Sequence, residues 1–279
     1  MKITIFTLIF IILFPIFTLT ISEAFINFIT NHYGEDIAKT LARQDLGRQG
    51  SYGGGNKRPN IKGKRPVILV HGITNSAGTF FSIRKYLLNH GYSDDLVYGT
   101  TYGDAGKTNI LMATMECRFI MQIRMFIQTV ADYTNSKVDI IAYSMGSPVA
   151  RKAILGSKCV DTGRDLGPPI TVLVEKFISV AGANYGSALC IFPFGSCNLI
   201  NGLNCNSKFI TDINRKQKYE GKRIYTIYSN ADDKVGYITC GQIASKIKGE
   251  NQSIQRTGMN HDQVIFNTAN LQLKLLRQK

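Results

Sequence analysis

The stretch from Lys137 to Gly146, Lys-Val-Asp-Ile-Ile-Ala-Tyr-Ser-Met-Gly, constrains the fold more than any other part of this chain. Its β-branched residues predict a short strand buried on both faces, and helix-forming residues resume directly afterwards. Ser144 would then lie on a sharp turn between strand and helix. Such a turn exposes the serine hydroxyl and needs small residues two positions away, here Ala142 and Gly146. A tight connection without chemistry is the alternative for this stretch alone.

Strands and helices alternate along the rest of the chain. Strands are expected at 66–72, 96–101, 177–181, 223–228 and 253–256, and helices at 25–48, 79–90, 109–133 and 261–276. This alternation predicts one α/β domain with a mostly parallel, doubly wound sheet and helices on both faces. Ligands of such sheets bind at the carboxyl ends of the strands, which is where Ser144 is expected.

A serine hydroxyl becomes a nucleophile when a histidine takes its proton and a carboxylate orients that histidine. Hydrolases with this kind of turn carry the three groups in the order serine, acid, histidine. The chain has four histidines, and His261 alone follows an acid at the required place. We predict Asp232 as the acid. Asp233 is the alternative acid, although its neighbour Lys234 favours a solvated surface pair there.

Five motifs in this order resemble a known family. They are Pro-Val-Ile-Leu-Val-His-Gly-Ile, Val-Asp-Ile-Ile-Ala-Tyr-Ser-Met-Gly, Val-Ala-Gly-Ala-Asn, Ile-Tyr-Ser-Asn-Ala-Asp and Gly-Met-Asn-His. Together they resemble the secreted class 2 lipases, an α/β-hydrolase family of small bacterial lipases with Ala-x-Ser-x-Gly elbows and many secreted members in nematodes. The resemblance extends from Arg65 to the C-terminus.

The resemblance implies an α/β-hydrolase fold with Ser144 as nucleophile, Asp232 as acid and His261 as base. It also implies an oxyanion hole formed by the backbone N–H groups of Ile73 and Met145. No metal and no cofactor are implied.

Three features depart from the family pattern. Tyr143 stands where the bacterial members usually carry histidine, Ser147 replaces a further glycine, and a cysteine-bearing insertion spans about 185–221. We assign Tyr143, together with His71 of the His-Gly turn, to substrate binding. None of the departures removes a catalytic group, but the insertion affects the size and shape of the pocket.

The N-terminus has the pattern of an export signal. Lys2 precedes an almost unbroken apolar run, which ends at the small-x-small site Ser22-Glu23-Ala24. We expect a cleaved signal peptide at 1–24 and a secreted, extracellular protein, with an uncleaved anchor as the alternative. An N-terminal helix and a glycine-rich basic linker are expected at 25–60, and a catalytic domain at 61–279.

Six cysteines follow the expected cleavage site. An exported chain folds where disulfides persist, so three bridges are expected. The sequence alone does not select among the possible connectivities; the pairs we favour are Cys117–Cys159, Cys190–Cys197 and Cys205–Cys240. Asn251 begins the N-glycosylation pattern Asn-Gln-Ser.

The formal net charge of +14 would suit nucleic acid or an anionic lipid surface. Export makes nucleic acid an unsuitable partner. We therefore expect a lipid or ester substrate at an anionic lipid–water interface, a monomer, and no stable membrane span after signal cleavage.

The leading functional hypothesis is a secreted triacylglycerol lipase that forms an acyl-enzyme on Ser144. The alternatives are a short-chain carboxylesterase, a phospholipid acyl-hydrolase, and a catalytically inactive binding protein of the same fold. We also expect the apolar segment 191–203 to form a disulfide-pinned partial cap over the acyl pocket, with a loop stapled elsewhere on the surface as the alternative.

Overall fold

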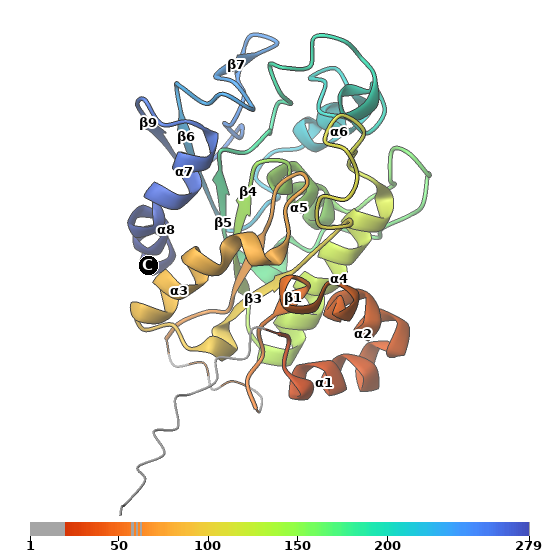
Figure 1. Ribbon diagram of the computed structural model, residues 1–279, viewed down its shortest axis with the longest axis vertical. Coiled ribbons are helices and arrows are strands. Elements are labelled where there is room, and N and C mark those ends of the chain that lie inside the picture. Colours follow the sequence, from red (N-terminus) through yellow and green to blue (C-terminus); the bar gives the residue numbers. More distant parts are fainter. Residues whose placement is uncertain (1–19, 57–58, 60, 62, 279) are drawn as a thin grey trace, which may run out of the picture.

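The computed structural model of the protein describes residues 20–56, 59, 61 and 63–278. Within these residues a seven-stranded sheet has the order β1-β3-β2-β4-β5-β6-β9 and is parallel except at β1 (Figure 1). The strands are β1 (Ser51–Tyr52), β2 (Val67–Val70), β3 (Val97–Thr100), β4 (Val138–Tyr143), β5 (Val174–Val180), β6 (Arg223–Ser229) and β9 (Gln252–Arg256). The predicted mostly parallel, doubly wound sheet is confirmed.

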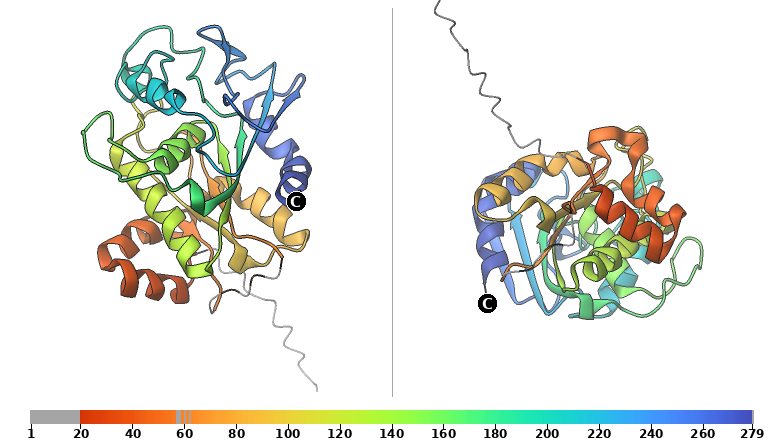
Figure 2. Two further views of the ribbon diagram at one scale, coloured as in Figure 1. Left: turned by 180° about the vertical axis from the view of Figure 1, so that it is seen from behind. Right: turned by 90° about the horizontal axis from the view of Figure 1, so that it is seen from below.

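Helices cover both faces of the sheet (Figures 1 and 2). They are α1 (Glu23–Tyr33), α2 (Glu35–Ala42), α3 (Phe81–Asn89), α4 (Cys117–Thr134), α5 (Gly146–Leu155), α6 (Lys208–Arg215), α7 (His261–Asn267) and α8 (Ala269–Arg277). The helices α1, α2, α4, α5 and α6 share one hydrophobic core, and α3, α7 and α8 share the other. The apolar residues of β4 alternate between these two cores, which explains why apolar side chains point to both faces of the strand; Asp139 is its one charged residue.

The N-terminal region differs from the expected helix and linker. The helix predicted at 25–48 breaks at Gly34, whose φ of 94° is a left-handed conformation that favours glycine. The expected linker contains β1, which pairs antiparallel with β3 and buries Tyr52 completely. The N-terminal region therefore joins the sheet through β1, which is the edge strand. The glycine-rich composition of this segment did not indicate a strand.

The expected signal peptide lies outside the described residues except for its last five positions. Ile21 is buried and bridges to Gly53, while the Ser22 hydroxyl accepts the Phe25 N–H and caps α1. Cleavage after Ala24 would remove these contacts. In the described part of the chain, no helix combines the length and the apolar character needed to cross a bilayer.

Two other predicted helices are shorter or interrupted. The helix expected at 109–133 begins only at Cys117, because Met115 donates its N–H to the Asn201 carbonyl and the Asp161 carboxylate accepts the Cys117 N–H. The preceding residues form turns. The helix expected at 261–276 is divided at Thr268 into α7 and α8.

Three disulfides join the pairs named in the sequence analysis, Cys117–Cys159, Cys190–Cys197 and Cys205–Cys240. The last of them ties the insertion before α6 to the turn of a small two-stranded sheet, β7 (Ile238–Thr239) and β8 (Gln242–Ile243). The insertion therefore cannot move freely from the loop that follows β6. It lies above the carboxyl ends of β4 and β5, near the top of Figure 1.

Candidate active site

The turn between β4 and α5 places Ser144 in an unusual conformation. Ser144 has a φ of 55°, which non-glycine residues rarely adopt. A Cβ atom at Gly146 would lie 2.1 Å from the His71 carbonyl oxygen, and one at Gly72 would lie 2.9 Å from the Ser144 Cβ. The two glycines therefore let the His-Gly turn after β2 pass directly against the serine.

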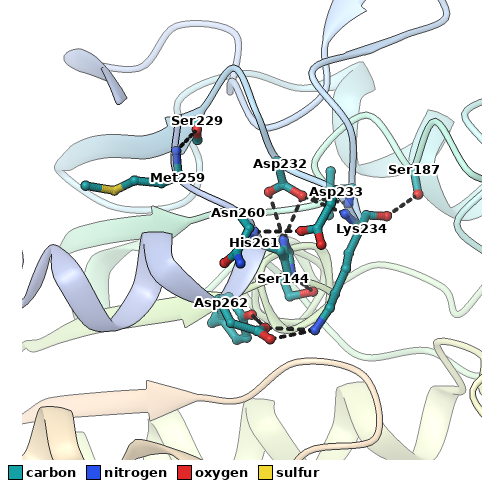
Figure 3. Close-up of polar contacts among 12 residues, drawn as sticks. Ser144, Ser187, Ser229, Asp232, Asp233, Lys234, Met259, Asn260, His261 and Asp262 are labelled. Atoms are coloured by element: carbon teal, nitrogen blue, oxygen red, sulfur yellow. Dashed lines mark hydrogen bonds and ion pairs between the residues drawn. The ribbon is translucent and has the colours of Figure 1, made fainter. Parts of the chain in front are cut away.

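Ser144, His261 and Asp232 form a continuous hydrogen-bonded line (Figure 3). The Ser144 Oγ lies 2.9 Å from His261 Nε2, and His261 Nδ1 lies 2.8 Å and 3.0 Å from the two Asp232 carboxylate oxygens. A carboxylate only accepts, so Nδ1 carries the proton and Nε2 is left to accept the serine hydroxyl. All three side chains are more than nine-tenths buried. The arrangement can transfer the hydroxyl proton to the imidazole.

The loop after β6 separates the two candidate acids. The Asp232 Oδ1 also accepts the backbone N–H groups of Lys234 and Val235, which fix its orientation toward His261. The exposed Asp233 accepts the backbone N–H of His261 at 2.9 Å, and this bond is the main reason that the pKa of Asp233 is lowered. Asp233 thus holds the histidine backbone, whereas Asp232 contacts the imidazole. The expected surface pair between Asp233 and Lys234 is not formed, because Lys234 binds Asp262.

His71 does not line the cavity that contains Ser144. Its Nε2 accepts the Tyr102 N–H, its Nδ1 donates to the Gly72 carbonyl, and its ring stacks on that of Tyr102 at 4.1 Å. Burial lowers the pKa of His71 to about 4, so the ring is neutral. The binding role expected from the sequence is therefore corrected: the buried His71 braces the turn that carries Ile73, and both ring nitrogens are occupied by the backbone.

The two residues expected to supply the oxyanion donors flank the serine on different segments. Met145 follows Ser144 directly, and Ile73 follows the glycine that packs against the serine Cβ. Ile73 lines the cavity above Ser144. An oxyanion hole formed by the backbone N–H groups of these two residues stays a prediction.

Sequence reasoning missed Asp262, the residue after His261. Its carboxylate accepts the Tyr143 hydroxyl at 2.8 Å and the Lys234 ammonium at 2.8 and 2.9 Å. Tyr143, expected as a binding residue, lines the cavity and lies against the imidazole of His261. The available signal was an acid in the first turn of a helix, directly beside the candidate base, but such acids also serve the helix dipole.

Ser144 lies in a cavity of about 490 Å³. Its walls come from the turn after β2, from the chain before α4, from the insertion and from α7. Apolar wall residues outnumber charged ones, and they include Ile73, Ile110, Leu111, Ala183, Leu189, Leu203, Val235 and Phe266. The volume and the mainly apolar lining are those of a small-molecule binding site.

The described residues contain one grouping with the composition of a metal site, Cys117, Cys159 and Asp161. Its two sulfurs are joined in a disulfide, and Asp161 accepts the Cys117 N–H.

The proposed glycosylation residue Asn251 is exposed just before β9, and its side-chain oxygen accepts the Ile224 N–H. Glycosylation at Asn251 stays a prediction.

A doubly wound sheet with a serine on the turn after a central strand, and with an acid and a histidine on later loops, is the organisation of the α/β-hydrolases. Comparison with known families agrees. Residues 64–274 match the family described as Lipase (class 2), and the chain belongs to this family. The protein is therefore a hydrolase of ester bonds, of the lipase and esterase kind.

Solved structures with the same fold include several lipases and esterases. The mature form of lipase BlEst2 from Bacillus licheniformis has a TM-score of 0.58 at 13% identity, and the match covers 81% of this chain and 97% of that one. Lipase B from Aspergillus fumigatus has a TM-score of 0.54 at 17% identity, covering 78% of this chain and 50% of that one. The propionate-bound esterase Est2 from Thermogutta terrifontis has a TM-score of 0.53 at 13% identity, covering 81% and 87%. These likenesses establish the fold.

Proposed function

We propose that the protein is a secreted triacylglycerol lipase that acts through an acyl-enzyme on Ser144. The observation that carries the proposal is the hydrogen-bonded line from Ser144 through His261 to Asp232, at the base of a mainly apolar cavity. The serine oxygen attacks the ester carbonyl while His261 Nε2 takes its proton. The alcohol leaves with that proton. Water then attacks the acyl-enzyme and its proton passes to His261. The bond between the serine oxygen and the acyl group breaks, the carboxylic acid leaves, and the serine oxygen takes the proton from His261.

The charge that develops on the carbonyl oxygen needs donors that are already in place. We assign this role to the backbone N–H groups of Ile73 and Met145. Backbone donors cost no reorganisation during the reaction, and removal of one donor from such a hole slows turnover by about a hundredfold or more. The brace formed by His71 and Tyr102 supports the assignment, because it restricts the turn on which Ile73 lies.

A group of exposed apolar side chains beside the cavity favours a lipase over a short-chain esterase. This apolar rim consists of Ile110, Leu111, Met112, Leu189, Ile191, Phe192 and Phe194. The Ser196 N–H bonds the Leu111 carbonyl at 2.7 Å, so the insertion and the chain before α4 form one continuous edge. An exposed apolar patch of this kind is suited to contact with an apolar phase, such as emulsified triacylglycerol.

Two measurements on the purified protein test the proposal. A fluorophosphonate probe should label wild-type protein on Ser144 and should leave the Ser144→Ala variant unlabelled. Hydrolysis of emulsified triacylglycerols of graded chain length is then compared with hydrolysis of a soluble butyrate ester and of phospholipid vesicles. We expect the highest activity on long-chain triacylglycerol. Absence of labelling and of turnover would indicate a binding protein, and a preference for the soluble or phospholipid substrate would reassign the enzyme to esterase or phospholipid acyl-hydrolase.

A further inference from the structure

One carboxylate joins the three segments that carry Ser144, Asp232 and His261. Asp262 lies in the first turn of α7, directly after His261. It accepts the hydroxyl of Tyr143, the residue before Ser144, and the ammonium of Lys234, two residues after Asp232. The Lys234–Asp262 ion pair is drawn in Figure 3, below the imidazole. A single side chain therefore links the serine turn, the acid loop and the histidine helix.

Tyr143 connects this carboxylate to the imidazole itself. The ring of Tyr143 lies 4.9 Å from the ring of His261, at an interplanar angle of 34°. The tyrosine is 3% exposed, and Phe80 packs edge-on against its ring. Burial and the hydrogen bond to Asp262 both raise the pKa of Tyr143, so the phenol stays protonated and remains a donor. The hydroxyl bond therefore sets the position of an aromatic face beside the imidazole.

Lys234 connects the same carboxylate to the acid loop. Its backbone N–H bonds Asp232, and its carbonyl accepts the hydroxyl of Ser187 from the insertion. The side chains of Lys234 and Asp262 are 52% and 54% exposed, and an exposed ion pair contributes little to folding stability. The lysine and the Tyr143 hydroxyl lower the pKa of Asp262 against the opposing effect of its partial burial. Asp262 is therefore a charged acceptor at neutral pH.

We propose that Asp262 is a positioning residue for the catalytic imidazole, which it holds through Tyr143 on one side and through Lys234 on the other. This inference rests on the proposed hydrolysis through Ser144. His261 must accept a proton from the serine and return it to the departing alcohol, so small rotations of its ring misalign both transfers. The Tyr143 ring blocks rotation toward β4. Its face also attracts the imidazolium that forms during each transfer.

The test compares single and double variants on one soluble ester at saturating concentration. Tyr143→Phe keeps the ring and removes the hydroxyl, and Asp262→Ala removes the acceptor. We expect each to lower kcat about tenfold with a smaller change in KM, because the hydrogen bond that both changes remove positions the imidazole for the proton transfers and does not hold the substrate. The double variant should be no slower than the slower single variant, since both changes break the same hydrogen bond. Labelling of Ser144 by the fluorophosphonate should slow in parallel.

Tyr219→Phe is the matched control. It removes another buried tyrosine hydroxyl, which bonds the Ile213 carbonyl on the opposite core, and it should lower the melting temperature without changing kcat. Asp262→Asn keeps an acceptor for the Tyr143 hydroxyl and should retain most of the wild-type kcat. This second variant keeps the inference testable if Asp262→Ala does not fold. Wild-type kcat in both single variants, or independent losses that multiply in the double variant, would overturn the inference. Wild-type protein that is itself inactive would instead refute the proposed function.

Discussion

The backbone at Ser144 is held in a conformation that few residues tolerate. Its left-handed φ of 55° raises the hydroxyl out of the sheet and brings Gly72 against its Cβ. Strain of this kind persists only where surrounding contacts enforce it, and it gathers at functional sites. The fit between Gly146 and the His71 carbonyl is one of those contacts.

Loss of the nucleophile or the base should abolish ester hydrolysis. Ser144→Ala and His261→Ala should each lower kcat by about a millionfold if the three residues act as a unit. Folding should survive, because neither change adds volume to the core and the Asp232 carboxylate keeps the backbone N–H groups of Lys234 and Val235 as donors when the imidazole is removed. For each variant we would measure turnover on a soluble ester, and the circular dichroism spectrum would show whether the variant is folded. A folded Ser144→Ala protein with near-normal turnover would refute the assignment of the nucleophile.

The two neighbouring acids should respond very differently to substitution. Asp232→Asn presents the imidazole with an amide that can stabilise the wrong tautomer, and should cost about ten-thousandfold in kcat. Asp233→Asn keeps an oxygen acceptor for the His261 N–H and faces water, so its effect should be small. Steady-state rates for both variants decide the matter. The opposite ranking would make Asp233 the acid.

A third carboxylate makes stability depend on pH. Asp139 in β4 is buried beside Arg65, and burial raises the pKa of Asp139 to about 6. A raised carboxyl pKa means that the folded state holds the proton more tightly than the unfolded chain does. The resulting stabilisation is complete below the ordinary pKa of 3.8 and is lost as the pH rises through about 6.

Asp139→Asn should therefore melt at the same temperature as wild type near pH 4 and at a higher temperature at pH 8. The amide keeps an acceptor for Arg65 without burying a charge. Thermal melts of both proteins across this range provide the measurement. A constant difference at every pH would show that the carboxyl does not titrate as proposed.

Among the structural elements, the insertion shapes the approach to the site. Leu189, Cys190, Ser196, Cys197 and Leu203 line the cavity, so the segment borders the pocket as a partial cap would. Phe192 and Phe194, which were expected to cover the acyl chain, instead point to solvent at 68% and 65% exposure.

Charges on this loop should separate emulsified from soluble substrates. Phe192→Asp and Phe194→Asp should depress hydrolysis of long-chain emulsified esters several-fold, because an exposed carboxylate opposes contact with an apolar phase. Hydrolysis of a soluble butyrate ester should be unchanged. Val172→Asp, which alters an equally exposed apolar residue at the amino end of β5, is the matched control. Equal losses on both substrates, or no loss on either substrate, would show that the loop has a purely structural role.

For the whole molecule, the excess positive charge bears on where the enzyme acts. The formal net charge is +14, and exposed charges attract anionic surfaces over distances set by the salt concentration. The inactive Ser144→Ala protein should cosediment with anionic phospholipid vesicles at roughly 0.05 M salt and dissociate at about 0.5 M. Vesicles of zwitterionic lipid should bind less. Salt-independent binding would assign the attraction to the apolar rim instead.

Much of this architecture is local in origin and can be predicted from the sequence. The buried strand β4 and the small residues around Ser144 depend on near neighbours in the chain, whereas the order of serine, acid and histidine was expected from the pattern of hydrolases with this turn. The acid loop was also predictable, but the choice between Asp232 and Asp233 depended on which side chain faces the imidazole. Periodicity does not distinguish adjacent positions in a loop.

The sequence by itself determined the fold class, the family, Ser144 and His261, and it narrowed the acid to Asp232 or Asp233, because strand burial and turn geometry restrict residue types over short distances. Tertiary structure alone decided the inward orientation of His71, the edge strand within the glycine-rich segment and the late start of α4. It also decided the partners of Asp262, since Tyr143 is 119 residues away in the chain. Contacts at such separations depend on how whole elements pack, and a local pattern does not encode that packing.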